Sequence, residues 1–292
     1  KGEMMNTSSL YKTPEGERAV MAIYDAALKN WSVPHETRTV PTRHGDTFVI
    51  ACGAATAPAL ILLHGAGSNS AIWAADAADY SRAHRVYAVD LPGEPGKSAP
   101  NRPAWDGSAF AEWLEDVLNG LQIDRATLVG ISQGAWTALK FAVVHPERVE
   151  QLVLLTPGGV VPDRTSFLFR AIGLSLLGTW GLKRLTASLF ADQPVPEGVI
   201  DIVVEISRHF KPRLGVLPIF ADEELRRLTM PILLVGGTKD IMRDLGQIEQ
   251  RLRQHVPKLT VKLLPGAGHA LINTQSYVLE FLTQKMVQAE SV

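Results

Sequence analysis

Cysteine is nearly absent, since the 292-residue sequence holds only Cys52. One thiol cannot form an intramolecular disulfide, and it has no Cys-x-x-Cys neighbour for zinc or redox chemistry. The chain also lacks an excess of charge of one sign, with 29 Lys and Arg against 30 Asp and Glu. Such a balance supplies no positive field to hold a polyanion, so we expect no nucleic-acid partner.

Long hydrophobic runs are missing as well. The longest apolar stretch, from Phe167 to Leu182, is interrupted by Arg170 and is shorter than the ~20 residues that a helix needs to cross a bilayer. Residues 1–10 are polar and lack the apolar core of a signal peptide. We therefore expect a cytoplasmic protein without a membrane partner; the oligomeric state cannot be inferred from the sequence.

Short apolar runs alternate with longer segments of helical periodicity along most of the chain, which is typical of a parallel sheet with crossover helices. The sequence thus predicts an α/β fold with eight strands. We expect the strands at Glu36–Val40, Thr47–Cys52, Ala59–Leu63, Arg85–Val89, Ala126–Ile131, Gln151–Leu155, Pro231–Gly236 and Leu259–Leu264. We expect helices near Pro14–Asn30, Ile72–Arg82, Ser108–Leu121, Gln133–Val144, Thr165–Leu189, Glu197–Phe210, Arg243–His255 and Thr274–Gln288.

Two connections between these strands are unusual. Residues 40–46 leave room only for a hairpin, so the second strand should be antiparallel in a mostly parallel sheet. Residues 158–230 contain no strand signal, which predicts a helical cap, or lid, inserted into a core made of residues 1–157 and 231–292. Such an insertion would lie over the carboxyl ends of the strands, and its apolar residues would pack on the core or line an acyl or alkyl pocket.

The strongest chemical signal is Gly130-Ile131-Ser132-Gln133-Gly134, a Gly-x-Ser-x-Gly motif between a predicted strand and a predicted helix. A turn this tight strains the serine backbone, and the flanking glycines let strand and helix approach without a Cβ clash. Its hydroxyl would stand above the sheet edge as a nucleophile. The N–H of Gln133 begins the following helix and has no intrahelical acceptor, so it can stabilise a developing negative charge.

With this motif the chain resembles the α/β-hydrolase family, whose nucleophile follows the fifth strand and whose triad runs in the order serine, acid, histidine. The resemblance extends from about Thr39 to the C-terminus and covers the sheet and its site loops. It implies that Asp240, after the strand that ends at Gly236, is the acid. It also implies that His269, in the loop Gly266-Ala267-Gly268-His269, is the base.

The resemblance also assigns supporting loops. His64-Gly65-Ala66 resembles the turn that supplies the second oxyanion donor, which implies the N–H of Ala66 as donor and His64 and Gly65 as supports of that loop. Residues 90–98 resemble the family's structural turn after the fourth strand, with one extra residue.

Several alternatives stay open at this point. Asp244 follows the same strand as Asp240, and Asp163 is a more distant candidate for the acid. The glycines of residues 65–67 followed by Asp90 at the end of the next strand come close to a dinucleotide-binding fingerprint, although Ser70 stands where its third glycine belongs.

The function we expect is a serine hydrolase that cleaves small or medium carboxylic esters with a hydrophobic part, through an acyl-enzyme and without metal or organic cofactor. The same triad also serves thioesterases, lactonases, carbon–carbon bond hydrolases and perhydrolases, and a non-catalytic ligand-binding member is the alternative of another class.

Overall fold

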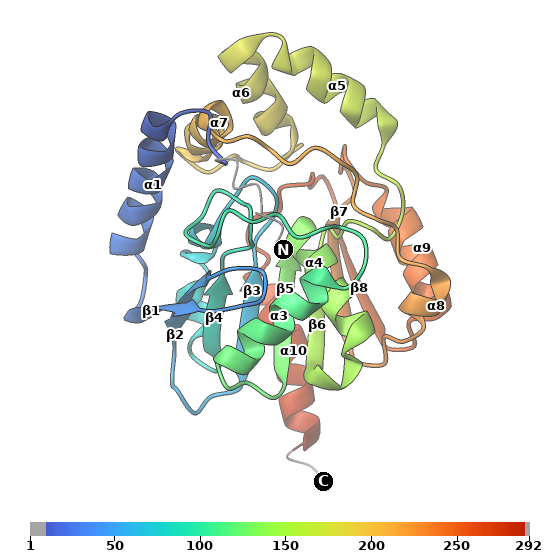
Figure 1. Cartoon of the computed structure of the whole chain (residues 1–292). Coiled ribbons are helices and arrows are strands. Elements are labelled where there is room, and N and C mark those ends of the chain that lie inside the picture. Colours follow the sequence, from blue (N-terminus) through green and yellow to red (C-terminus); the bar gives the residue numbers. More distant parts are fainter. Residues whose placement is uncertain (1–9, 290–292) are drawn as a thin grey trace, which may run out of the picture.

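The computed structural model describes residues 10–289, with side chains up to residue 283. One eight-stranded sheet forms its centre, with helices on both faces (Figure 1). The strands lie in the order β1-β2-β4-β3-β5-β6-β7-β8. Their bounds are β1 His35–Val40, β2 Thr47–Cys52, β3 Ala59–Leu63, β4 Arg85–Val89, β5 Ala126–Ile131, β6 Val149–Leu155, β7 Ile232–Gly237 and β8 Leu259–Leu264.

The predicted α/β-hydrolase fold, with eight strands and an antiparallel second strand, is confirmed. β2 pairs antiparallel with both β1 and β4, whereas every pair from β4 to β8 is parallel. The parallel strands therefore end at one edge of the sheet, and the loops that leave their carboxyl ends gather there.

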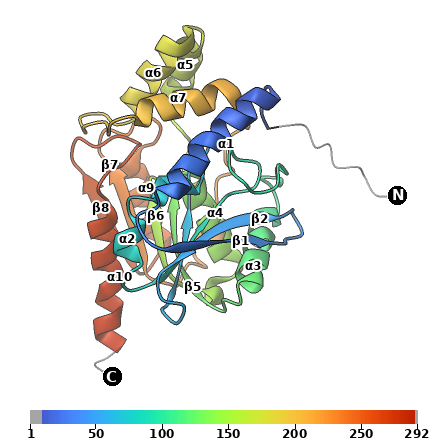
Figure 2. The same cartoon turned by 90° about the vertical axis from the view of Figure 1, so that its left-hand side faces the viewer.

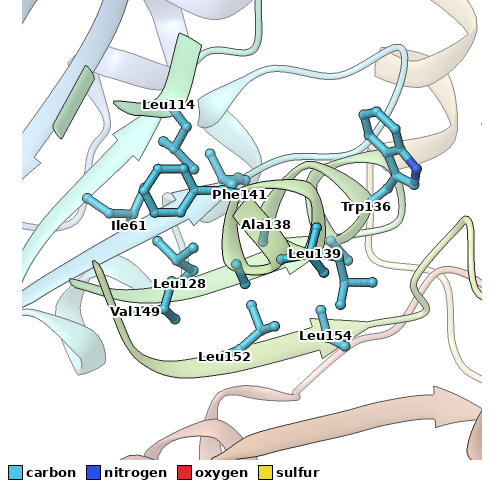
Figure 3. Packing of buried hydrophobic residues seen from close by; sticks show 14 of the residues in the cluster. Ile61, Leu114, Leu128, Trp136, Ala138, Leu139, Phe141, Val149, Leu152 and Leu154 are labelled. Carbon is cyan, nitrogen blue, oxygen red and sulfur yellow. The ribbon is translucent and has the colours of Figure 1, made fainter. Parts of the chain in front are cut away.

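Alternation along each strand divides the apolar side chains between two cores. In β3, Ile61 and Leu63 join the cluster on one face, and Leu60 and Leu62 join the cluster on the other. Figure 3 shows the first cluster, in which Leu128 of β5 and Leu152 of β6 lie beneath helix α4. The sheet is thereby fixed on both faces, which gives its loops a rigid base.

Helices cover both sides of this sheet. The first face carries α3 Ala109–Gly120, α4 Gln133–Val144 and α9 Leu245–His255, together with the short α8 Asp222–Leu225. The opposite face carries α1 Pro14–Lys29, α2 Ala77–Tyr80 and α10 Gln275–Ala289, together with the 3-10 turn Ser70–Trp73. None of the helices in the described range is both long and apolar enough to cross a membrane.

The connection between β6 and β7, which we call the β6–β7 insert, holds three longer helices before α8. They are α5 Thr165–Ser175, α6 Gly178–Ser188 and α7 Val199–His209, and they lie beyond one end of the sheet (Figure 1). Helix α7 lies against α1, as the turned view shows (Figure 2). The α5–α6 hairpin presents exposed apolar side chains, among them Phe169, Leu176 and Trp180.

Backbone bonds hold the insert to the core at several places; before α5, the N–H of Arg164 donates to the carbonyl of Met242 at 2.7 Å. The segment at Tyr11 forms an antiparallel bridge with Phe210 at the end of α7. After α6, Ala191 forms a bridge with Ala267, and the N–H of Ala270 donates to the carbonyl of Leu189 at 2.9 Å. The attachment after α6 joins the insert directly to the loop that carries His269.

Several predicted helices differ from the structure; α7, for example, begins at Val199, two residues later than predicted. Residues 72–82 form a 3-10 turn and the short α2 rather than one helix. The predicted Thr165–Leu189 helix is divided into α5 and α6, because Gly178 has a φ of 59° at the break. Helix α9 begins at Leu245, two residues later than predicted, because the Asp244 side chain caps it by accepting a bond from the N–H of Gln247.

Candidate active site

Ser132 stands at a sharp turn between β5 and α4. Its φ is 53°, a left-handed conformation that is uncommon outside glycine, and its side chain is nearly buried. A Cβ at Gly130 would lie 2.5 Å from the backbone N of Ala135, and a Cβ at Gly134 would lie 2.2 Å from the carbonyl oxygen of Leu63. Both glycines are therefore needed for the close approach of β3, β5 and α4 that forms this turn.

Three loops bring a hydroxyl, an imidazole and a carboxylate together. The Oγ of Ser132 lies 3.2 Å from the Nε2 of His269, whose loop follows β8. The Nδ1 of His269 lies 2.8 Å from the Oδ2 of Asp240, whose loop follows β7. These distances allow a proton to pass from the hydroxyl to the imidazole while the carboxylate fixes the orientation of the ring.

Asp240 is buried, yet it remains an effective anion. Burial alone would raise the pKa of its carboxyl, but the hydrogen bond and charge of His269 and the amides of Arg243 and Met242 outweigh it, so this pKa lies below its usual value. The Oδ1 accepts bonds from the N–H of Met242 at 2.7 Å and of Arg243 at 3.0 Å. The carboxylate is thus held in one orientation toward His269.

The two other acid candidates have different partners. Asp244 caps α9 and forms an ion pair with Arg164 at 3.1 Å. Asp163 forms an ion pair with Arg243 at 2.9 Å. The structure therefore places Asp240, and neither of these two carboxylates, against His269.

The loop after β3 lies beside Ser132. A Cβ added to Gly65 would lie 3.8 Å from the Cβ of Ser132, so the backbone of this loop passes close to Ser132. The N–H of Ala66 has no acceptor within the described residues. The N–H of Gln133, at the first position of α4, has no carbonyl one turn before it. Both amides are available as hydrogen-bond donors.

His64 is fully buried and has both ring nitrogens engaged. Its Nε2 accepts a bond from the N–H of Leu91 at 2.9 Å, so its proton is on Nδ1, which donates to the carbonyl of Gly65 at 2.8 Å. Burial lowers the pKa of His64, which favours this neutral form. The imidazole joins the loops after β3 and β4, and both of its nitrogens are bonded to partners other than Ser132.

The loop after β4 brings an unexpected carboxylate to the loop after β3. Glu94 is 4% exposed; its Oε2 accepts a bond from the N–H of Gly67 at 2.7 Å, and its Oε1 accepts one from the Gln133 side chain at 3.1 Å. Burial raises the pKa of Glu94 to about 7, although these bonds and the charges of Arg102 and Arg213 oppose the rise. The extra residue noted in this loop was the only sequence signal of an unusual feature here.

Arg243 is the second residue that the sequence analysis missed. Its side chain is almost completely buried, and its Nη1 donates to the Oγ of Ser132 at 3.0 Å and to the carbonyl of Thr156 at 2.6 Å. Its Nε donates to the Oδ1 of Asp163 at 2.9 Å. The expected helix start at Arg243 placed this residue in α9, whereas in the structure it lies before the Asp244 cap, in the loop after β7.

No group of three or more His, Cys, Asp or Glu side chains that could hold a metal ion occurs in the described part of the chain. The polar groups at the carboxyl ends of β5, β6, β7 and β8 instead form one continuous hydrogen-bonded set around Ser132. That set can activate a hydroxyl and hold an anion beside it.

Comparison with known proteins agrees with this geometry. Residues 60–279 match the alpha/beta hydrolase family. The uncharacterized carboxylesterase nap of Bacillus subtilis is 32% identical over 277 residues, covering 92% of each chain. The carboxylesterase YbfK of the same organism is 31% identical over 292 residues, covering 97% of each. The crystal structure of naproxen esterase from B. subtilis superposes with a TM-score of 0.82 at 29% identity, covering 94% of this chain and 99% of that one.

The family match spans the loops that hold Ser132, Asp240 and His269, and the two carboxylesterases share nearly the whole length of the chain. Fold, strand order and sequence similarity thus all indicate the same family. The chain belongs to the α/β-hydrolase family.

Proposed function

We propose that the protein is a serine carboxylesterase. The observation that carries the proposal is the hydrogen-bonded series from Ser132 through His269 to Asp240, with steps of 3.2 and 2.8 Å. Similarity to two B. subtilis carboxylesterases over more than nine-tenths of the chain supports it.

In the proposed reaction, His269 takes the hydroxyl proton of Ser132 as Oγ attacks the ester carbonyl, and Asp240 stabilises the imidazolium. The tetrahedral oxyanion accepts hydrogen bonds from the N–H groups of Ala66 and Gln133. The alcohol leaves with the proton from His269, and an acyl-enzyme remains on Ser132. Water then attacks this ester with His269 as base, which releases the acid and restores the hydroxyl.

The β6–β7 insert serves in this proposal as a helical cap of residues 158–230 over a core of residues 1–157 and 231–292. Its exposed apolar side chains, Phe169 and Trp180 among them, suit esters with a hydrophobic acyl or alkyl part of small to medium size. The expected substrate is thus a small-molecule ester. The cytoplasmic location expected from the sequence stays a prediction.

Labelling with a fluorophosphonate probe, followed by hydrolysis of p-nitrophenyl esters of increasing chain length, tests the proposal. Ser132→Ala should abolish labelling and lower turnover by about 10⁶, with an unchanged melting temperature. Thioester and lactone controls separate the related hydrolases. Absence of labelling in folded wild-type protein would favour a ligand-binding member, and retained turnover in Ser132→Ala would refute the nucleophile.

A further inference from the structure

Arg243 places a permanent positive charge in contact with the proposed nucleophile. Its guanidinium cannot lose a proton in a protein, and Nη1 lies 3.0 Å from the Oγ of Ser132. This contact differs from the one with His269 in its direction. The arginine donates a hydrogen bond to the hydroxyl oxygen, whereas the imidazole accepts one from the hydroxyl. We infer that Arg243 is a further catalytic residue, which stabilises the Oγ of Ser132 as a leaving group when the acyl-enzyme breaks down; this inference rests on the proposed esterase function.

The arginine is held in place by a site built for it. The carbonyl of Thr156 accepts a bond from Nη1 at 2.6 Å, and Asp163 accepts one from Nε at 2.9 Å. Thr156 has a φ of 46°, which is strained for a β-branched residue, and its buried hydroxyl has no hydrogen-bond partner among the described residues. Burying a cation is costly, and backbone strain persists only where the surrounding structure enforces it. The buried guanidinium of Arg243 and the strained backbone of Thr156 both lie directly beside Ser132.

Oγ of Ser132 can accept the hydrogen bond from Arg243 and still attack an ester carbonyl. A serine hydroxyl has one proton and two lone pairs. The proton is directed to His269 and one lone pair accepts from Arg243, so the second lone pair is left to attack a carbonyl carbon. Arg243 transfers no proton at any step.

The contact changes strength during the catalytic cycle. In the free enzyme Oγ is a hydroxyl oxygen and already accepts the bond, so part of the stabilisation is present before acylation. In the acyl-enzyme Oγ is the alkoxy oxygen of an ester, whose lone pair is delocalised into the carbonyl and accepts hydrogen bonds weakly. After water has attacked, the C–Oγ bond breaks, its electron pair returns to Oγ, and His269 delivers the proton.

Negative charge therefore grows on Oγ as the acyl group leaves, and the bond from Arg243 strengthens at that moment. An interaction that is weak in the ground state and strong in the transition state lowers the barrier, whereas one that is equal in both does not. Arg243 should thus accelerate deacylation more than acylation. A donor aimed at developing charge is worth about 10²–10³ in rate, as for an oxyanion-hole donor.

Burst kinetics with p-nitrophenyl butyrate separate the two steps, because nitrophenolate appears on acylation and the steady state reports deacylation. In Arg243→Met the deacylation rate should fall by about 10²–10³ and the acylation rate by less than about tenfold. The butyryl-enzyme should then accumulate and be visible by intact-protein mass spectrometry. Arg243→Lys, which keeps the charge, should recover part of the deacylation rate.

Arg164→Met is the matched control, since Arg164 is exposed, adjoins Asp163 and pairs with Asp244 away from Ser132. It should reproduce the wild-type kinetics. If Arg243→Met does not fold, Asp163→Asn combined with Arg243→Met removes both partners of the ion pair and permits the same measurement. Should that variant not fold either, the ratio of the two rates in Arg243→Lys decides: deacylation slowed more than acylation supports the role, and any other ratio overturns it.

Equal loss of both rates, or loss of neither, would overturn the role of Arg243 while leaving the esterase proposal intact. A wild-type protein without burst, turnover or fluorophosphonate labelling would instead overturn the esterase itself.

Discussion

Relative to wild type, Glu94→Gln should gain stability as the pH rises from acid to alkaline values. Burial raises the pKa of Glu94 from 4.5 to about 7, so the folded protein binds its proton more tightly than the unfolded chain does. Below about pH 4.5 the group is protonated in both states and has no effect on stability. As pH rises toward 7 the unfolded chain ionises first, and folding is increasingly penalised; above 7 the penalty is constant.

The size of this penalty follows from the shift. A difference of about 2.5 pH units at 1.36 kcal/mol each gives about 3 kcal/mol in full, of which roughly 2.5 kcal/mol develops between about pH 5 and 8.5. Glutamine cannot ionise, so the variant lacks this pH-dependent loss, whatever it loses in hydrogen bonds to Gly67 and Gln133.

Urea denaturation of wild type and Glu94→Gln at about pH 5 and about pH 8.5 gives the stability difference between the two proteins at each pH. The stability of the variant minus that of wild type should increase by about 2.5 kcal/mol from pH 5 to pH 8.5. The exposed Glu197→Gln serves as control and should not reproduce the change. A difference between wild type and Glu94→Gln that is the same at both pH values would refute the reasoning.

Two other variants test the geometry of the site. Asp240→Asn should lower turnover of p-nitrophenyl butyrate by about 10⁴, because it removes the charge that orients and stabilises His269; Asp244→Asn should cost less than about tenfold, and the reverse order would reassign the acid. Gly134→Ala should reduce the free energy of unfolding by about 1–3 kcal/mol, because its Cβ would meet the Leu63 carbonyl at 2.2 Å. Gly173→Ala in α5 is its control: no atom lies within 4 Å of the added Cβ, so chemical denaturation should show unchanged or increased stability.

Much of the sheet could be predicted because its signal is local. Buried parallel strands appear as short apolar runs, and β2, β3, β4, β5 and β8 have the predicted bounds. The helix from Gln133 to Val144 also has its predicted bounds, since the elbow glycines and His145-Pro146 mark its two ends.

The remaining features depend on contacts between distant segments. Within the insert, the apolar residues around Leu176 continue across Gly178, so periodicity alone does not reveal the break between α5 and α6. Arg243 and Glu94 became candidates because their side chains form hydrogen bonds with Ser132 and Gly67. These contacts join distant segments, and no spacing in the sequence predicts them. The resemblance already favours Asp240 over Asp244 as the acid because of its position after β7, and the structure adds the 2.8 Å contact between Asp240 and His269.

The main-chain bonds that join Leu189 to Ala270, and Ala191 to Ala267, attach the end of α6 to the His269 loop. The bridge at Phe210 secures α7 in the same way. Both ends of the α5–α6 hairpin are thus anchored, at Arg164 through its bond to the Met242 carbonyl and at Leu189, and the left-handed Gly178 lies between these two anchors. In the proposed cap, a substitution in α5 therefore leaves the attachment of the His269 loop intact, so substrate entry and the chemistry at Ser132 can be altered by separate changes.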